Sequence, residues 1–196
     1  VIDLKKWRII RPNMYLSINL SVQHFLQDNL IPYLKNILKQ HDLPSEALKF
    51  EVTESMLISD PDKAIATMRA LDNLGVVLAL DDFGTGYSSL SYLKKLPLKI
   101  LKIDRTFISG VGVNIADEAI VETILALANS LNMKCIAEGV ENERQLKFLG
   151  EKHCHLIQGF LYSKAVPASR IEQYLLADVI EVQVSEPESL SDLNNG

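Results

Sequence analysis

The sequence predicts an α/β fold, a TIM-like (β/α)8 barrel with roughly six of the eight strand–helix units present in this chain. Short apolar runs alternate with amphipathic stretches along most of the 196 residues. Such alternation is typical of parallel strands joined by right-handed helical crossovers. A polar side chain also stands near the carboxyl end of each apolar run, where barrels of this type place their active sites.

The strands and helices are expected from hydrophobic periodicity. The expected strands are Tyr15–Leu20, Leu48–Thr53, Val76–Asp81, Ile100–Asp104, Lys134–Glu138 and Leu156–Tyr162. The expected helices are Val22–Gln40, Pro61–Leu74, Ser88–Lys95, Ala116–Leu131, Glu143–Gly150 and Ala168–Ala177, and a further helical pattern opens the chain around Trp7.

Alternation and capping residues justify these elements in turn. In the first strand Ser17 and Asn19 share one face, and in the fourth Lys102 lies between two apolar neighbours. Between the second and third strands, Asp60-Pro61 is a strong helix start, because Asp caps the amide groups and Pro suits the first helical position. Gly75 fits the end of that helix.

Two architectures compete, an open doubly wound sheet and a closed barrel. No glycine fingerprint for phosphate follows the first strand, which weakens the dinucleotide-binding sheet. A barrel needs eight strands, so the barrel interpretation requires an N-terminal pair outside this chain. The chain begins at Val1, within a helical pattern, and we therefore expect a fragment of a longer polypeptide.

Composition limits the function classes. The formal net charge of −5 argues against a general DNA or RNA binder, which would carry a basic face. A small nucleotide ligand remains possible, because divalent cations neutralise carboxylates and phosphates together. No apolar run reaches the ~20 residues that span a membrane, and no signal peptide is present. We expect a domain over residues 1–177 and an acidic tail or linker over 178–196.

The two cysteines, Cys135 and Cys154, are too few for a disulfide framework and favour a reducing, cytoplasmic compartment. A longer parent protein could still be anchored in a membrane with this domain on the cytosolic side. Cys154 stands between His153 and His155, which would suit zinc by ligand type. Neighbours on a strand point to opposite faces, however, and this disfavours a site made from those three residues.

Polar residues at the strand ends are the most informative feature. Taken singly, such residues are more often helix caps or surface ion pairs. Here they recur every 20 to 36 residues, which is one strand–helix unit each, and independent caps have no reason to choose the same end of every strand. The residues are Asn19, Glu51, Asp81, Lys102, Glu138 and Gln158.

The residue types indicate a metal or phosphate site. Carboxylates are hard oxygen donors that suit Mg²⁺ or Mn²⁺, and several of them in one pocket repel one another unless cations lie between them. Two ions about 4 Å apart would bind a phosphodiester and activate water. Asp81 and Asp82 face opposite ways in an ideal strand, so both reach the site only if the chain bends, which Gly84 and Gly86 permit.

Six blocks of the sequence, in order, resemble the EAL domain family. The central block is Asp81-Asp82-Phe83-Gly84-Thr85-Gly86-Tyr87-Ser88-Ser89-Leu90, which lacks the lysine strand and catalytic loop that accompany Asp-Phe-Gly in protein kinases. The other five are Ser17-Ile18-Asn19-Leu20-Ser21, Glu51-Val52-Thr53-Glu54-Ser55, Lys102-Ile103-Asp104, Ala137-Glu138-Gly139-Val140-Glu141 and Gln158-Gly159.

The resemblance implies hydrolysis of cyclic di-GMP to linear pGpG in bacterial second-messenger signalling. It implies that Lys102 holds or polarises the attacking water, or stabilises charge, while Gln158 positions substrate or a bound water. Glu141 would brace the loop that contains Gly84, Thr85 and Gly86. The first metal would be held by Asn19, Glu51, Asp81 and Glu138, and the second by Asp81 and Asp82, with Asp82 also near the substrate.

The Glu-Ala-Leu motif that names the family is absent. In the family it precedes the helix at which this chain begins, so we interpret the sequence as truncated and expect the fragment alone to be unstable or inactive. Two other functions remain open, a non-hydrolysing cyclic-di-GMP receptor and a dimerisation module. The resemblance further implies a homodimer and upstream sensory or GGDEF-type domains in the parent chain.

Overall fold

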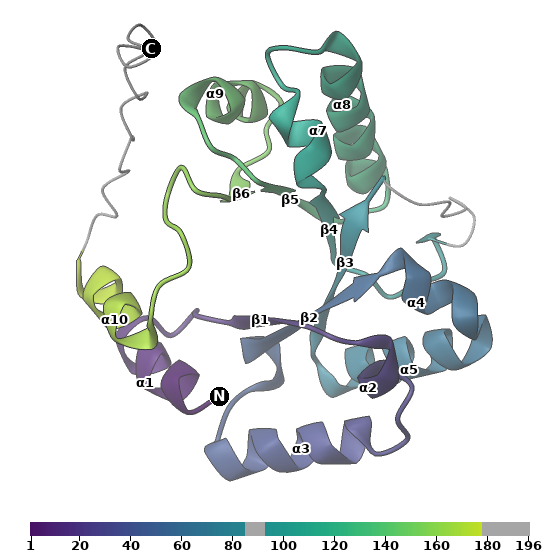
Figure 1. Ribbon diagram of the computed structural model, residues 1–196. Coiled ribbons are helices and arrows are strands. Elements are labelled where there is room, and N and C mark those ends of the chain that lie inside the picture. Colours follow the sequence, from purple (N-terminus) through teal and green to yellow (C-terminus); the bar gives the residue numbers. More distant parts are fainter. Residues whose placement is uncertain (85–92, 178–196) are drawn as a thin grey trace, which may run out of the picture.

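The computed structural model describes residues 1–84 and 93–177 of the chain (Figure 1). The expected helix Ser88–Lys95 lies mostly outside these residues, and the expected tail over 178–196 lies entirely outside them. The elements in order are α1 (Ile2–Ile10), β1 (Leu16–Asn19), α2 (Val22–Phe25), α3 (Leu30–His41), a 3₁₀ turn (Ser45–Ala47), β2 (Leu48–Thr53), α4 (Glu54–Ser59), α5 (Pro61–Leu74), β3 (Val77–Phe83), β4 (Ile100–Ile103), α7 (Arg105–Ser109), α8 (Ile115–Ser130), β5 (Lys134–Glu138), α9 (Glu143–Glu151), β6 (Leu156–Gln158) and α10 (Ala168–Leu176).

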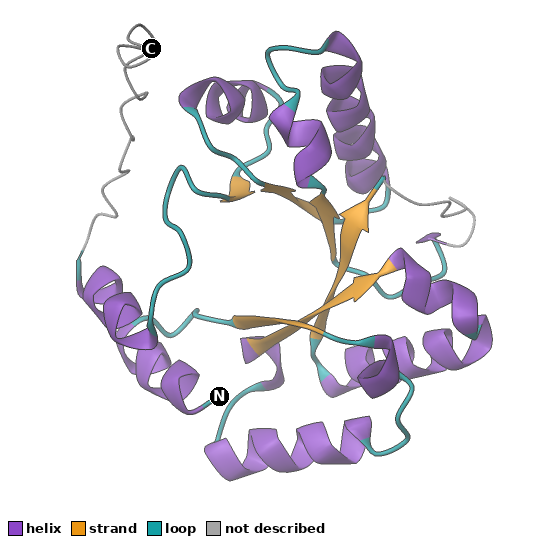
Figure 2. Ribbon diagram, viewed as in Figure 1, coloured by secondary structure: helices purple, strands orange, loops and turns teal. Residues whose placement is uncertain are grey.

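The strands form one parallel sheet in the order β1-β2-β3-β4-β5-β6. Figure 2 shows this sheet curving into an arc with helices around its outer side, which confirms the α/β barrel class with six strands in a half-barrel. The arc is open between β1 and β6. Helices α1 and α10 lie side by side across that opening (Figure 1), where Arg11 Nε donates to the Leu175 carbonyl oxygen at 3.3 Å.

The core lies between the sheet and the outer helices. Leu78 and Leu80 of β3 point outward to this layer, and Met68 and Leu71 of α5 are completely buried against it. Alternation along β3 then leaves the opposite face of the strand for polar residues, because successive strand side chains point to opposite faces. Burial of the outer face therefore fixes which side chains face the inside of the arc.

Helix ends follow the capping residues expected from the sequence. The Asp60 side chain accepts a hydrogen bond from the Lys63 amide at 3.1 Å, with Pro61 as the first residue of α5. Gly75 ends α5 with a φ of 89°, a left-handed conformation that glycine adopts without a steric penalty. These caps place the start of β3 directly after α5.

The single helix expected over Val22–Gln40 is wrong, because the chain breaks after Phe25 and resumes as α3 at Leu30. Ser21 caps the short α2, and a turn at Gln27 separates the two helices. Pro32 stands in the first turn of α3, where a missing amide hydrogen costs nothing. The short helices α4 and α7 were not anticipated, since runs this short carry too little periodicity.

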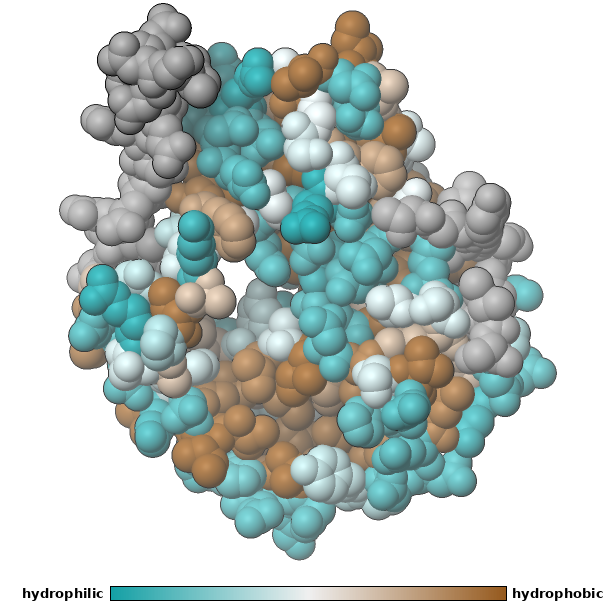
Figure 3. Space-filling view, viewed as in Figure 1, coloured by the Kyte–Doolittle hydropathy of each residue, from teal (hydrophilic) through white to brown (hydrophobic). Residues whose placement is uncertain are grey.

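An apolar patch lies beside the first strand and the helix α3. In Figure 3 hydrophobic residues gather between β1 and α3, where a cavity of about 520 Å³ is lined by Ile18, Leu30, Leu34 and Phe50 among others. Among the described residues, no helix is both long enough and apolar enough to cross a membrane.

Candidate metal-binding active site

The polar residues expected at the strand ends come together on the inner side of the sheet. Asn19 ends β1 opposite Glu51 of β2, and Glu138 ends β5 opposite Gln158 of β6. Lys102 lies on β4 between them. The parallel register brings these residues into neighbouring positions, because the carboxyl ends of parallel strands share one edge of the sheet.

Lys102 is at the centre of the cluster. Its Nζ atom lies 2.5 Å from Glu51 Oε2, 2.9 Å from Asp81 Oδ1 and 2.6 Å from Glu138 Oε1. Burial would lower the pKa of Lys102, but the hydrogen bonds that it donates to three carboxylates outweigh burial and hold that pKa above its usual value. The lysine is therefore a fixed cation at neutral pH.

A bend in β3 allows adjacent aspartates to reach one site. Asp82 has a φ of 53°, and the register of β3 against β4 shifts between Leu80 and Phe83. This bulge turns the Asp82 carboxylate to the same side as that of Asp81. The bend therefore includes Asp82 itself. Gly84, two residues later, also has a positive φ, of 102°. Thr85 and Gly86 lie outside the described residues.

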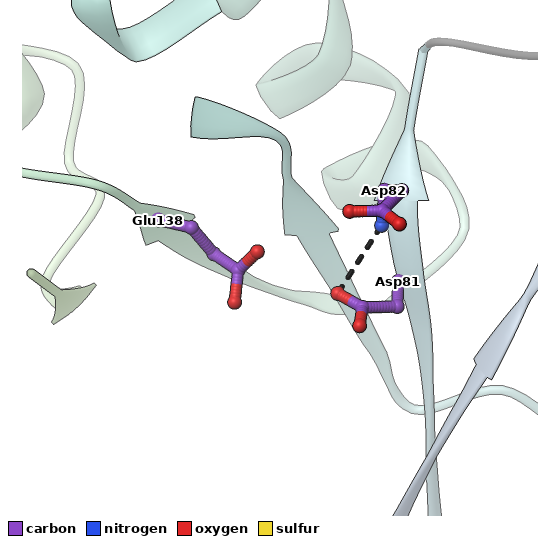
Figure 4. A group of neighbouring side chains, drawn as sticks. All are labelled: Asp81, Asp82 and Glu138. Carbon is purple, nitrogen blue, oxygen red and sulfur yellow. Dashed lines mark hydrogen bonds between the residues drawn. The ribbon is translucent and has the colours of Figure 1, made fainter. Parts of the chain in front are cut away.

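Figure 4 shows Asp81, Asp82 and Glu138 pointing toward one another from β3 and β5. One oxygen from each carboxylate lies within 4.8 Å of the others, a spacing that a single cation can bridge. Burial first, and then the neighbouring carboxylates, raise the pKa of Glu138 even though Lys102 opposes the shift. Burial and Asp81 likewise raise the pKa of Asp82. Both pKa shifts are caused first by burial and only then by the neighbouring negative charge.

The donor set fits divalent cations. Four carboxylates and one ammonium leave the cluster with an excess of negative charge that one lysine cannot neutralise. The Asn19 amide can donate through its nitrogen to Asp81 Oδ2 at 3.2 Å and Glu51 Oε2 at 3.0 Å. If the side-chain oxygen of Asn19 points inward instead, it faces the Asp81 and Glu51 carboxylate oxygens. Mg²⁺ or Mn²⁺ binds such a group of acceptor oxygens.

Two features of the site were not singled out from the sequence. Ser17 Oγ donates to Glu51 Oε1 at 2.5 Å and so orients that carboxylate. Its place on the same strand face as Asn19 was the available signal. Arg105 and Lys164 line the neighbouring cavity, and neither stands at a strand end, so the pattern that found the other residues could not reveal them.

That cavity has a volume of about 490 Å³ and opens beside the acidic cluster. Its lining includes Asp82, Glu138, Gln158, Phe160 and Lys164. Glu141 also lines it, and its backbone amide donates to Gln145 Oε1 at 2.8 Å. Its volume lies within the range of small-molecule binding pockets, and it adjoins the carboxylates.

Comparisons with known proteins identify the family and several relatives of this chain. The EAL domain profile matches residues 1–165. The chain is 41% identical over 162 residues to the cyclic di-GMP phosphodiesterase NbdA of Pseudomonas aeruginosa, covering 83% of this chain and 21% of that protein. It is 44% identical over 156 residues to MucR of the same organism, named a bifunctional diguanylate cyclase/cyclic di-GMP phosphodiesterase, covering 80% of this chain and 23% of that protein.

A solved structure, the PaMucR phosphodiesterase in complex with c-di-GMP, superimposes with a TM-score of 0.79 at 40% identity. The match covers 86% of this chain and 70% of that one. The chain thus spans about a fifth to a quarter of the length of the curated relatives it matches.

Proposed function

The chain belongs to the EAL domain family, and from this membership we propose that the full-length protein hydrolyses cyclic di-GMP to linear pGpG in a reaction that needs Mg²⁺ or Mn²⁺. The observation that carries the proposal is the convergence of Glu51, Asp81 and Glu138 on Lys102 beside a cavity. The related phosphodiesterases and the solved c-di-GMP complex support the choice of substrate.

Two cations per site would be held by this chain's own oxygens. Asn19, Glu51, Asp81 and Glu138 would bind the first, and Asp81 and Asp82 the second. Bound divalent cations polarise a phosphodiester and lower the pKa of water. The side chains around the cations would carry out the remaining tasks of the reaction.

Lys102 contributes a fixed positive charge. Its positive charge would hold an attacking water by a hydrogen bond or stabilise charge that develops on the phosphate. Gln158, on the cavity wall, would orient the substrate. Ser17 holds Glu51 in place by its hydrogen bond.

Incubation of the full-length protein with cyclic di-GMP and Mg²⁺ or Mn²⁺, followed by chromatography of the nucleotides, tests the proposal. We expect pGpG to appear, to vanish with EDTA, and to be abolished in Glu51→Ala and Lys102→Ala. The matched control is Lys99→Ala, which removes an exposed lysine whose Nζ lies 3.6 Å from Asp72. Binding of cyclic di-GMP without turnover would overturn hydrolysis and favour a receptor.

The proposal also includes a homodimer, an upstream domain and a cellular location. Val113 and Ile115, 77% and 85% exposed beside the start of α8, support a homodimer contact at that corner. Sedimentation of Ile115→Asp against the unchanged chain tests it, and an unaltered mass would contradict it.

The bifunctional name of MucR supports an upstream GGDEF-type or sensory domain, and the free thiols together with a nucleotide substrate support a cytoplasmic location.

A further inference from the structure

One aromatic side chain lines the mostly polar cavity beside the acidic cluster. Phe160 stands two residues after Gln158, in the loop that leads from β6 to α10 (Figure 1), and it lines the cavity together with Asp82 and Glu138. Among the described residues that form this lining, Phe160 alone carries an aromatic ring, and it is 60% exposed. The proposed hydrolysis gives this ring no task.

The turn around Phe160 is anchored on both sides. The preceding residue, Gly159, approaches the loop after β5 so closely that a Cβ atom there would lie 2.1 Å from the Val140 carbonyl oxygen. The following residue, Leu161, is buried, and its amide donates to the same carbonyl oxygen at 3.0 Å. The Tyr162 amide donates to the Gly159 carbonyl oxygen at 3.2 Å and closes the turn. Fixed neighbours therefore hold the Phe160 ring in its exposed position.

A cation lies against the Phe160 ring. The Nζ atom of Lys164 is 5.5 Å from the ring centroid, which is within the range of a cation–π contact. In the described part of the chain, no second aromatic ring stacks on that of Phe160. Arg105 lines the same cavity and adds a second positive charge. The cavity thus combines an accessible ring face with two cations, a combination that suits a ligand with planar bases and phosphates.

We propose that Phe160 stacks on a guanine base of the cyclic dinucleotide, an inference that rests on the proposed function. The substrate carries two purine bases, and the acidic cluster with its cations would engage only the phosphodiester. One cavity of about 490 Å³ is lined by both Glu138 and Phe160, so a single ligand can contact the cluster and the ring together. Stacking on an aromatic side chain is a general way of holding a base, because every base has a π face.

A single exposed apolar side chain is ordinary on a protein surface. Phe160 differs from such a residue in two respects. It belongs to a cavity whose other described lining is mainly charged or polar, and its backbone is fixed by the contacts of Gly159 and Leu161. An accessible ring held rigidly in a polar cavity loses little conformational freedom when a base stacks on it.

The variant Phe160→Trp tests the stacking directly in the full-length protein. Guanine quenches the fluorescence of an indole that it contacts, so we expect cyclic di-GMP with Mg²⁺ to quench this variant immediately after mixing, beyond any change in the unchanged protein. The matched control is Tyr33→Trp on α3, because Tyr33 is 61% exposed and does not line this cavity. Its fluorescence should not respond to the nucleotide.

Kinetics of the phenyl-deleted variant give a second measurement. We expect Phe160→Ala to raise KM about tenfold to a hundredfold, the range expected for one base–aromatic stack, with little change in kcat. Phe160→Tyr keeps a ring and should keep KM near that of the unchanged protein, and Tyr33→Ala should leave KM unchanged. Because Phe160 is exposed, its removal should not change the melting temperature.

The outcomes separate this inference from the proposed hydrolysis. Formation of pGpG with no quenching in Phe160→Trp, or with an unaltered KM in Phe160→Ala, would overturn the stacking and leave hydrolysis standing. Quenching in Phe160→Trp without any pGpG would support the stacking and overturn hydrolysis. A full-length protein that binds no cyclic di-GMP in equilibrium dialysis would overturn both.

Discussion

The Nζ atom of Lys102 lies 2.5 Å from Oε2 of Glu51, and both side chains are almost completely buried. A buried ion cluster is costly to break, because removing one partner leaves uncompensated charge. We expect Lys102→Met to lower the free energy of unfolding by about 3–5 kcal/mol, as measured by urea denaturation without divalent cations. Addition of Mn²⁺ should restore part of the loss.

The matched control is Lys99→Met, whose exposed partner Asp72 lies 3.6 Å away. Exposed pairs contribute at most about 1 kcal/mol, so this variant should behave like the unchanged chain. Similar losses in both variants would contradict a special role for the buried lysine.

The strand ends of this site could be predicted from sequence because polarity and spacing recur in each unit. Asn19, Glu51, Lys102 and Glu138 fell on one edge for that reason. The break between α2 and α3 escaped prediction, because its apolar residues keep a helical spacing through the turn at Gln27. The adjacent aspartates required a bend in this strand, but its position at Asp82 rather than at a glycine escaped prediction, since a positive φ at a non-glycine residue depends on tertiary contacts that periodicity does not encode.

Replacement of Asp82 has two effects, the loss of a carboxylate and a change in backbone strain, and two variants separate them. Both Asp82→Asn and Asp82→Ala remove a carboxylate, so each should bind fewer Mn²⁺ ions by calorimetry than the unchanged chain. Asparagine tolerates a φ of 53° better than alanine does. We therefore expect Asp82→Ala to be less stable than Asp82→Asn by about 1 kcal/mol. Equal stability of the two variants would show that the turn carries no strain.

The raised pKa of the Cys135 thiol predicts that the chain loses stability at alkaline pH. Burial raises its pKa from 9.0 to about 12 in the folded chain, so the unfolded chain releases this proton first as pH rises. The contribution of the neutral thiol is complete below pH 9 and is lost progressively as pH rises toward the folded-state pKa of about 12. We expect the free energy of unfolding to fall more steeply over this window in the unchanged chain than in Cys135→Ala.

Parallel denaturation curves across that window check this prediction, with EDTA present to exclude metal binding. Lysines and tyrosines titrate in both proteins and cancel in the comparison. Identical slopes would mean that the thiol is as accessible in the folded chain as in the unfolded one.

Gly159 lets the chain after β6 pass close to the loop after β5. A Cβ atom at this residue would lie 2.1 Å from the Val140 carbonyl oxygen and 2.4 Å from the Val140 amide nitrogen, and backbone cannot move aside as a flexible side chain can. The same loop is held by hydrogen bonds from the Val140 amide to the Gln158 carbonyl and from the Leu161 amide to the Val140 carbonyl.

We expect Gly159→Ala to lower the free energy of unfolding by about 1–3 kcal/mol and to raise KM, because Gln158 is displaced on the cavity wall. Gly150→Ala is the matched control, since nothing lies within 4 Å of a Cβ there and the residue is inside α9. Alanine should stabilise that helix by up to about 1 kcal/mol with KM unchanged. A KM for Gly159→Ala equal to that of Gly150→Ala would show that the close approach at Val140 does not position Gln158.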